Sequence, residues 1–283
     1  MSPSLLVVVP TYGQFEYAIR AVRTALAHTA YMLATVAVID DASPERLSRD
    51  IHSVDEPYGN YLLNLRWIRE EFGADRLLQL EFDQNGGLTR SWNVGLQVAR
   101  DGKFDLCCVT NSDVMFAHGW DRDVFALLNA EKYHLVGPVT NAPGTNHDQY
   151  VGNYSVVYDP RKKDDTEHIA RVQDELHGQQ SLRSKPTTLN GFCMVSLTET
   201  WWANAYAADA VFRPRNEFNA RGEKNPTPLM TLNEYELQRR WHARGLKSGV
   251  ALGSYVYHYR AVSRGDRHKR GDWARIRDEG TAR

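Results

Sequence analysis

The segment LLVVVPTYG at residues 5–13 begins with five consecutive apolar side chains and ends in proline and polar residues. A continuous apolar run of this kind is typical of a central parallel strand that is buried on both faces. Phe15, Ile19, Val22 and Leu26 follow at spacings of four, three and four, the pattern of one face of an amphipathic helix. The segment therefore predicts a strand followed by a helix.

The same alternation continues through the first half of the chain. Strands are predicted at residues 35–39, 77–82 and 104–109. Helices are predicted from Pro44, with Ser43 as the N-cap, and over residues 88–98. Strands and helices at this spacing indicate parallel strands joined by right-handed crossovers. We expect an α/β fold whose central sheet is mostly parallel and is flanked by helices.

Four of the predicted strands end in polar clusters. These clusters are Pro10-Thr11-Tyr12, Asp40-Asp41, residues 83–87 and Asn111-Ser112-Asp113. Ligands of such sheets gather at the carboxyl ends of the strands, so we expect the clusters to form one binding edge. Taken singly, each cluster is equally compatible with an ordinary polar loop.

The second half of the chain is less regular. Its predicted elements are a strand at 135–139, a polar binding loop at 140–153, a surface helix at 164–176, a strand at 188–197, a helix at 231–244 that ends at Gly245, and a last strand at 250–259. Residues 213–228 form a long polar stretch with prolines, which is typical of a lid or of a disordered loop.

Composition narrows the class of protein. The 283 residues are 42% hydrophobic and 24% charged, with a net charge of -1, which indicates a globular protein without a general electrostatic attraction to nucleic acid. Cys107, Cys108 and Cys193 form no C-x-x-C pair and read as buried hydrophobes in a reducing compartment. Because no apolar stretch reaches the length of a signal peptide core or a membrane span, we expect a cytoplasmic protein without a transmembrane segment.

Several different short motifs follow one another along the chain. They are Val9-Pro10-Thr11-Tyr12, Ile39–Ser43, Asn85-Gly86-Gly87 with Asn93–Leu96, Asn111-Ser112-Asp113, Asn190-Gly191-Phe192, and Asn233–Leu237 with Arg240. Their order and spacing resemble the family 2 glycosyltransferases of the GT-A fold, over roughly residues 4–260. The resemblance implies a Rossmann-like fold with a nucleotide-sugar-binding half at 1–116, an acceptor-binding and catalytic half at 117–259, and a basic C-terminal tail at 260–283.

The resemblance also assigns a donor pocket to the first half. It implies that Pro10, Thr11 and Tyr12 line the base pocket and that Asp40 or Asp41 accepts a hydrogen bond from base or ribose. Asn85 and Gly86 would approach the donor closely, and Arg90 would face the diphosphate. As alternatives, Asp41 caps a helix beside Ser43, the segment 85–87 is a plain turn, and Arg90 is solvated.

Asn111-Ser112-Asp113 takes the place of the family's Asp-x-Asp motif. The resemblance implies that Asp113 binds Mg²⁺ or Mn²⁺ on the donor diphosphate and that His258 is a further metal ligand, a mixed set that suits Mn²⁺. Asn111 and Ser112 would also contact the donor, but Asn111 brings no charge where the family has an acid. As alternatives, the triplet is a turn after a strand and His258 bonds only to backbone.

The resemblance places the general base of an inverting transfer at Glu234, where the family has an aspartate. Such a reaction needs a carboxylate to take the acceptor proton and positive charge on the departing diphosphate. Asn190, Gly191, Phe192, Glu236 and Arg240 would lie on the acceptor side. Alternatively, Thr231 and Glu234 form a capping box, and Glu236 is an exposed acid in a first helical turn.

Together these residues predict metal-assisted transfer from a nucleoside-diphosphate sugar, preferably a UDP-sugar. The acceptor would be a glycan, a lipid-linked sugar, a protein or a modified nucleic acid, and we expect residues 213–228 to close after donor binding. The alternatives are a non-catalytic sugar-nucleotide-binding relative and a nucleotidyltransferase, although Thr11-Tyr12-Gly13-Gln14 lacks the basic residue of a phosphate loop. Trp201, Trp202 and Trp241 stack on sugars or, alternatively, belong to the core. Residues 260–283 carry eight basic residues against four acids and either contact an anionic partner or form a solvated tail.

Overall fold

A computed structural model describes residues 2–47, 53, 55–144, 146–159, 161–162, 165–214 and 233–259. The predicted tail at 260–283, Thr231 of the expected capping box and residues 215–228 of the expected lid lie outside them. The strands are β1 (Ser4–Thr11), β2 (Leu33–Asp40), β3 (Leu77–Glu81), β4 (Leu106–Thr110), β5 (Val114–Phe116), β6 (Leu135–Val139), β7 (Ser184–Pro186), β8 (Cys193–Leu197) and β9 (Ser248–His258). The α-helices are α1 (Phe15–His28), α2 (Pro44–Leu47), α3 (Pro57–Phe72), α4 (Leu88–Asp101), α5 (Asp121–Asn129), α6 (Thr166–Gln180), α7 (Thr198–Ala203) and α8 (Asn233–His242).

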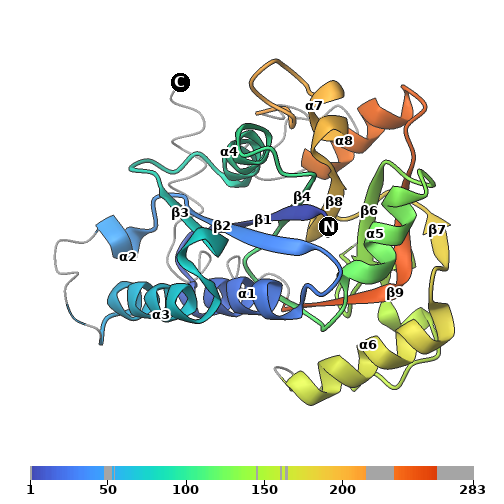
Figure 1. Cartoon of the computed structure of the whole chain (residues 1–283), viewed down its shortest axis with the longest axis horizontal. Coiled ribbons are helices and arrows are strands. Elements are labelled where there is room, and N and C mark those ends of the chain that lie inside the picture. The colour runs from blue at the N-terminus through green and yellow to red at the C-terminus, as the bar shows by residue number, and fades with distance from the viewer. Residues whose placement is uncertain are drawn as a thin grey trace.

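The described strands form one sheet that runs through both halves of the chain (Figure 1). Its order is β3-β2-β1-β4-β8-β6-β9-β5, with β7 paired to β9. β3, β2, β1 and β4 are parallel, which confirms the predicted α/β half. Beyond β4 the sheet is mixed, because β8 is antiparallel to both β4 and β6 whereas β6 and β9 are parallel.

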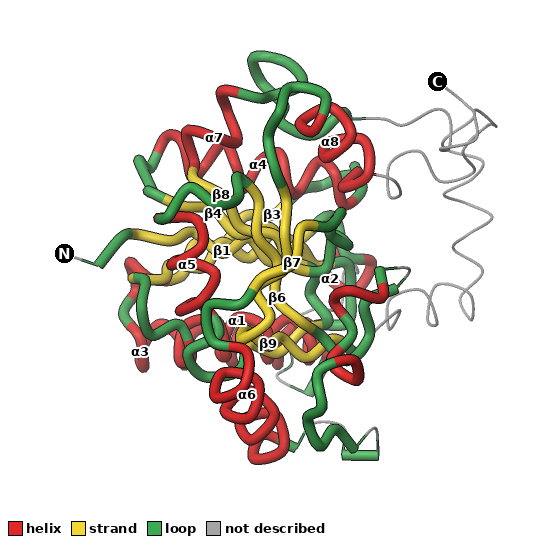
Figure 2. Tube along the Cα trace, turned by 90° about the vertical axis from the view of Figure 1, so that its right-hand side faces the viewer, coloured by secondary structure: helices red, strands yellow, loops and turns green. Residues whose placement is uncertain are grey.

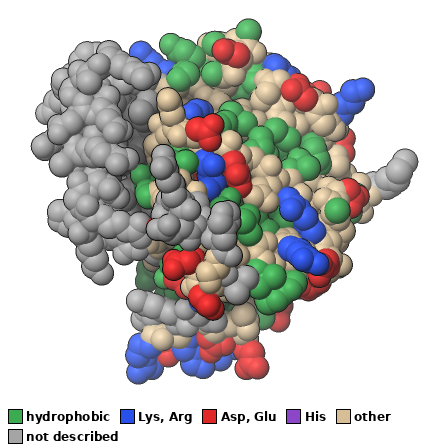
Figure 3. All heavy atoms as spheres, turned by 90° about the vertical axis from the view of Figure 1, so that its left-hand side faces the viewer, with side chains coloured by type: hydrophobic (Ala, Val, Ile, Leu, Met, Phe, Trp, Pro, Cys, Tyr) green, Lys and Arg blue, Asp and Glu red, His purple; other side chains and the backbone are tan. Residues whose placement is uncertain are grey.

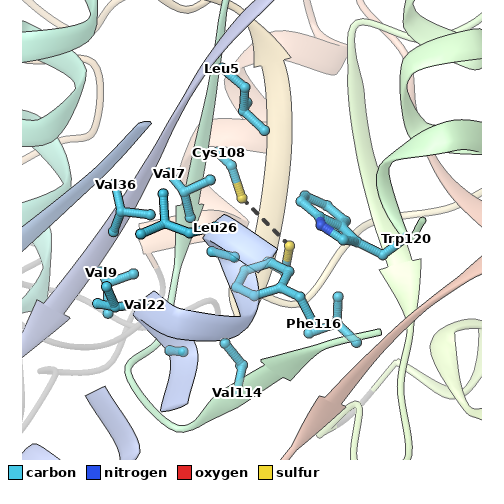
Figure 4. Packing of buried hydrophobic residues seen from close by; sticks show 14 of the residues in the cluster. Leu5, Val7, Val9, Val22, Leu26, Val36, Cys108, Val114, Phe116 and Trp120 are labelled. Atoms are coloured by element: carbon cyan, nitrogen blue, oxygen red, sulfur yellow. Dashed lines mark hydrogen bonds between the residues drawn. The ribbon is translucent and has the colours of Figure 1, made fainter. Parts of the chain in front are cut away.

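Each face of the sheet buries its own apolar core. Leu5, Val7 and Val9 point to the core that α1, α3 and α5 cover, and a part of this core is drawn in Figure 4. Leu6 and Val8 point to the opposite core, which α4, α6, α7 and α8 cover. This alternation along one fully buried strand explains why residues 5–9 are continuously apolar.

The helices α4, α7 and α8 lie across the sheet from α1 and α3, as Figure 2 shows. Helix α4 approaches the sheet closely because it carries a glycine at the contact: a Cβ atom on Gly95 would lie 2.3 Å from a methyl carbon of Val8. Any other residue at position 95 would push α4 away from β1, and α4 begins at the binding edge of the sheet.

Several predicted elements need correction. β8 begins at Cys193, so Asn190-Gly191-Phe192 precede the strand instead of lying within it as predicted. The helix predicted at 164–176 runs from Thr166 to Gln180, and Ile169, Val172 and Leu176 bury one of its faces. All three cysteines are buried and free, as expected. Among the described residues, no helix combines the length and apolar character that crossing a bilayer requires.

Candidate functional site

The polar strand ends meet at one edge of the sheet, as the sequence predicts. Thr11 at the end of β1 pairs with Asp40 at the end of β2, and β4 ends beside β1 at Thr110. Figure 3 shows the molecule from the side of α2, which follows β2, and acidic, basic and apolar side chains are interspersed there.

Asp40 is bound on both carboxylate oxygens by the chain that follows it. One oxygen accepts hydrogen bonds from the backbone N–H and the hydroxyl of Ser43, and the other accepts from Nε of Arg46 at 2.8 Å. Burial raises the pKa of Asp40, although these hydrogen bonds and the positive charge of Arg46 oppose that shift. The carboxylate thus holds the start of α2 against the end of β2.

Asp41 holds the turn before α4. Its carboxylate accepts the backbone N–H groups of Gly86 at 3.1 Å and Gly87 at 2.7 Å, and it also pairs with the guanidinium of Arg90. Gly87 precedes α4 with a φ of 82°, a conformation that favours glycine. Asp41 therefore fixes the turn that leads into α4, through N–H groups that lie before the helix begins.

Arg90 is held within the fold on several sides. Besides Asp41, its guanidinium donates to the carbonyl of Gln84 and lies 4.0 Å from the ring centroid of Phe82. One third of the side chain is exposed, so it borders the binding edge while it ties the 84–87 turn together. Asn85 in the same turn is exposed.

The turn after β1 is compact. Thr11 is buried and its hydroxyl donates to the carbonyl of Gly13 at 2.7 Å, while the N–H of Gly13 donates to the hydroxyl of Ser43 at 2.7 Å. Pro10 is buried and Tyr12 is half-buried. The ends of β1 and β2 are therefore joined through Ser43, which also binds Asp40.

Asn111, Asp113 and His258 come together although the histidine lies 145 residues beyond the aspartate. β5, which follows the triplet, is antiparallel to β9 with Val114 opposite His258. Nε2 of His258 lies 3.3 Å from Oδ1 of Asp113 and 3.4 Å from Nδ2 of Asn111. Ser112, the middle residue of the triplet, is half-buried.

The other side of the imidazole is fixed by residues 141 and 142. Nδ1 of His258 lies 3.0 Å from the carbonyl oxygen of Ala142, and Asn141 exchanges two hydrogen bonds with the backbone of His258. Because a carbonyl oxygen only accepts, Nδ1 carries the ring proton and the lone pair of a neutral imidazole lies on Nε2. The ring also stacks on Phe192, with 5.4 Å between centroids.

With this tautomer, Nδ2 of Asn111 donates to Nε2 of His258, and a positive charge between Nε2 and the carboxylate of Asp113 would stabilise their close approach. A divalent cation that both atoms ligate supplies such a charge. Among the described residues, no group of three or more His, Cys, Asp or Glu side chains could hold a metal ion. Asp113 and His258 nevertheless fit a cation whose remaining ligands come from a diphosphate, whereas Asn111 presents its amide nitrogen to Nε2 and so is placed as a donor.

Glu234 lies close to the segment that precedes β8. A Cβ atom on Gly191 would be 3.3 Å from the carboxyl carbon of Glu234 and 2.9 Å from the indole of Trp92. The absence of a side chain at position 191 therefore leaves the space that the carboxyl group of Glu234 occupies. The neighbouring Phe192 accepts the N–H of Asn111 on its carbonyl at 3.0 Å, so Glu234 and the Asn111–Asp113–His258 group both contact the same short segment.

Glu236 and Arg240 face away from that segment, towards residues 204–211. Nε of Arg240 lies 3.3 Å from a carboxylate oxygen of Glu236, and its guanidinium donates to the carbonyls of Asn204 and Val211. Trp201 and Trp241 are fully buried and pack on each other, as expected of core residues, and Trp202 donates to the carbonyl of Leu96.

Sequence reasoning missed the residues that orient the site. Asn141 and Ala142 fix His258, and the only signal for them was the polar loop predicted at 140–153. Gln149 and Gln238 are fully buried and hydrogen-bond the backbone beside Gly191, but a single glutamine in a loop or a helix carries no sequence signal.

Comparison with known proteins gives one family and likenesses to solved structures, two of which are described next. The profile described as Glycosyl transferase family 2 matches residues 6–195. The crystal structure titled GalNAc-T7 with UDP, GalNAc and Mn²⁺ superposes with a TM-score of 0.60 at 13% identity, over 91% of this chain and 44% of that one. The structure of TarS residues 1–349 from S. aureus superposes with a TM-score of 0.54 at 12% identity, over 90% of this chain and 60% of that one.

The likenesses to the solved structures confirm the expected GT-A fold. The chain spans less than two thirds of either protein, 44% of one and 60% of the other. The search of curated proteins found no match.

Proposed function

The chain belongs to glycosyl transferase family 2, and from this premise we propose that it moves a sugar from a nucleoside diphosphate to a hydroxyl acceptor with inversion at the anomeric carbon. The observation that carries the proposal is that Glu234 lies against Gly191 while Asn111 and His258 contact the neighbouring Phe192. A base and a site for the leaving group are the two parts that such a displacement needs.

We assign the donor to the edge formed by Pro10, Thr11, Tyr12 and the acids that follow β2. A UDP-sugar is the favoured donor, and the likeness to a structure that holds UDP and Mn²⁺ supports this choice. Asp40 and Asp41 keep the turns of this edge in place, and Asn85 and Gly86 border it.

Asp113 and His258 would hold Mn²⁺ or Mg²⁺, which neutralises the charge on the departing diphosphate when bound, and Asn111 would contact the donor beside them. Ala142 and Asn141 keep Nε2 of His258 directed at Asp113, so this pair is oriented before any ligand arrives. Asn111 contributes no charge, and a lower metal affinity than that of an Asp-x-Asp site follows.

Glu234 would take the proton of the acceptor hydroxyl while the acceptor oxygen bonds to the anomeric carbon and the bond to the diphosphate breaks. Glutamate reaches one methylene further than aspartate. Gly191 provides room for that longer side chain, because its missing Cβ lies where the carboxyl group packs. Asn190 and Phe192 would border the acceptor beside it, and Glu236 with Arg240 supports the helix that carries the base.

The proposal is tested first by donor binding. Thermal unfolding is measured with a panel of UDP-, GDP- and TDP-sugars, each with MnCl₂, with MgCl₂ and with EDTA. We expect a metal-dependent rise in melting temperature for UDP-sugars. A response to no nucleotide sugar would contradict the proposed donor site.

Turnover is then measured as UDP release from the sugar nucleotide that binds. Glu234→Gln should lower UDP release by about 100-fold or more while donor binding is unchanged, since general-base catalysis contributes on the order of 10²–10⁴. Glu199→Gln, an exposed glutamate in the first turn of α7, is the matched control and should be neutral. Near-wild-type turnover of Glu234→Gln would remove Glu234 as the base, and donor binding without any UDP release would favour the non-catalytic alternative.

A further inference from the structure

The segment Leu189–Phe192 connects the proposed base with the proposed metal ligands. At one end, the carbonyl of Phe192 accepts from the N–H of Asn111 at 3.0 Å and from the hydroxyl of Thr110 at 2.6 Å, and its ring stacks on His258. At Gly191 the segment lies against the carboxyl group of Glu234. A shift of this segment would therefore change the distance between Glu234 and the metal ligands.

Gln238 binds this segment through both atoms of its amide. Its Oε1 accepts the N–H of Leu189 at 2.7 Å, and its Nε2 donates to the carbonyl of Leu189 at 2.8 Å. The same Nε2 lies 3.0 Å from the carbonyl of Glu234, one helical turn earlier. An amide is the side-chain group that offers a donor and an acceptor without charge, so it pairs with Leu189 as a neighbouring strand would.

Gln149 holds the next residue from the side of β6. Its Oε1 accepts the N–H of Asn190 at 2.8 Å, and its Nε2 donates to the carbonyl of Pro138 in β6 at 3.0 Å. Both glutamines are fully buried. The segment is thus fixed to α8 by one amide and to the sheet by the other, in surroundings where an unmade hydrogen bond is costly.

Helix α8 does not depend on Gln238 for its own attachment. Leu237 and Trp241 are buried in the core, and the indole N–H of Trp241 donates to the carbonyl of Asn204 at 3.1 Å. Arg240 adds a hydrogen bond of 2.9 Å to the carbonyl of Val211. The bonds of Gln238 therefore set the place of Leu189 relative to α8, whereas the other contacts set the place of α8 itself.

We infer that Gln238 is a positioning residue for sugar transfer, which holds Leu189–Phe192 against α8 and so sets the distance between Glu234 and the Asn111–Asp113–His258 group. This inference rests on the proposed function, since it assumes that Glu234 and that group act on one substrate. It predicts a loss in turnover without a loss in donor binding, because Gln238 does not border the donor edge.

The test compares Gln238→Met with Gln173→Met. Gln173 is a matched control: it is also buried, and its amide makes the same pair of bonds, to the carbonyl of Gly253 and from the N–H of Tyr255, both at 2.7 Å, but between α6 and β9. Both variants should lose similar thermal stability. We expect kcat for UDP release to fall about 10- to 100-fold in Gln238→Met, with KM for the UDP-sugar unchanged, and to stay within twofold in Gln173→Met.

Equal kcat values in the two variants, whether both are low or both are normal, would overturn the inference. Amide hydrogen exchange provides a readout that needs no turnover: residues 189–192 should exchange faster in Gln238→Met than in wild type and in Gln173→Met. Unchanged protection there would also overturn it. Wild-type turnover in Glu234→Gln would instead contradict the proposed base and leave the exchange result to decide the role of Gln238.

If Gln238→Met does not fold, Gln238→Glu provides a second test of the inference. A carboxylate accepts from Leu189 but donates to its carbonyl only when protonated, so the kcat ratio of Gln238→Glu to wild type should rise as pH falls from 8 to 5. The ratio for Gln173→Glu should not. A ratio that is independent of pH would contradict the pairing with Leu189.

Discussion

Acidic side chains lie at the carboxyl ends of both β2 and β4, but the groups that surround their carboxylates differ. At the end of β2, the carboxylates of Asp40 and Asp41 each accept several donors from the adjoining turns, and both acids hold these turns in place. After β4, the carboxylate of Asp113 lies 3.3 Å from Nε2 of His258, whose other ring nitrogen faces the carbonyl oxygen of Ala142. Asp40 and Asp41 therefore stabilise the fold, whereas the pairing of Asp113 with a histidine is suited to bind a cation.

Asp113→Asn should have the largest effect on activity. Without this charge we expect UDP release in the presence of Mn²⁺ to fall about 1,000-fold, which corresponds to about 4 kcal/mol of transition-state stabilisation. The melting temperature should change little. Asp105→Asn, at the opposite end of β4, is the control; its carboxylate accepts from the N–H and hydroxyl of Ser4. The control should keep wild-type turnover. Turnover of Asp113→Asn within tenfold of wild type would contradict the difference between the ends of β2 and β4.

Asp41→Ala should show the opposite behaviour. It leaves the N–H groups of Gly86 and Gly87 and the partly buried guanidinium of Arg90 without this acceptor. We expect the free energy of unfolding to fall by about 2–3 kcal/mol in urea titration. Asp83→Ala, in the same turn and 96% exposed, should change it by less than about 0.5 kcal/mol. A loss in Asp41→Ala no larger than that of its control would deny Asp41 the structural role.

Asn141→Ala tests the orientation of His258 with a smaller effect. Asn141 accepts the N–H of His258 at 2.7 Å and donates to its carbonyl at 3.0 Å. Partners that orient a metal ligand are typically worth about 10- to 100-fold in metal affinity, and we expect about tenfold here. The Mn²⁺ concentration for half-maximal UDP release measures it. An unchanged Mn²⁺ requirement would mean that β9 alone orients the imidazole.

Asp40 gives the smallest effect, and it appears in the pH dependence of stability. Burial raises its pKa in the folded protein above the ordinary value of 3.8, so the folded state binds its proton more tightly than the unfolded state does. The stability due to this group is full below pH 3.8 and declines as pH rises through the raised pKa. Asp40→Asn should therefore cost more stability at pH 3.5 than at pH 7. Urea titrations at both values measure the difference, and the reverse order would contradict the burial of a carboxylate at this position.

The sequence predicts the parallel half of the sheet well because period and composition are local signals. Residues 5–9 had to be buried on both faces, and the structure places Leu5 and Leu6 in opposite cores. The sequence does not predict β5, because a segment of three residues is too short to show a period. The predicted start of β8 lies before the observed one, because Phe192 is apolar without belonging to the strand.

The site is less predictable because its geometry depends on pairings between distant segments. The resemblance to the family's motifs pointed to Asp113 and His258, but only the antiparallel pairing of β5 with β9 brings the two residues together. Gly191 was expected on the acceptor side, yet its packing against Glu234 follows from the placement of α8. The sequence does not distinguish Gln149 and Gln238 from exposed glutamines, and only the structure shows that they are buried.

The pairing of Val114 with His258 also has a consequence for synthesis. A chain that emerges from the ribosome exposes the parallel strands β1 to β4 first, and these can associate while β9 is still to be translated. Asp113 then waits for its imidazole partner until nearly all of the described sequence has been made. The polar edge at the ends of β1, β2 and β4 thus forms before the pair of Asp113 and His258, and under the proposed function a nascent chain becomes active only when β9 is in place.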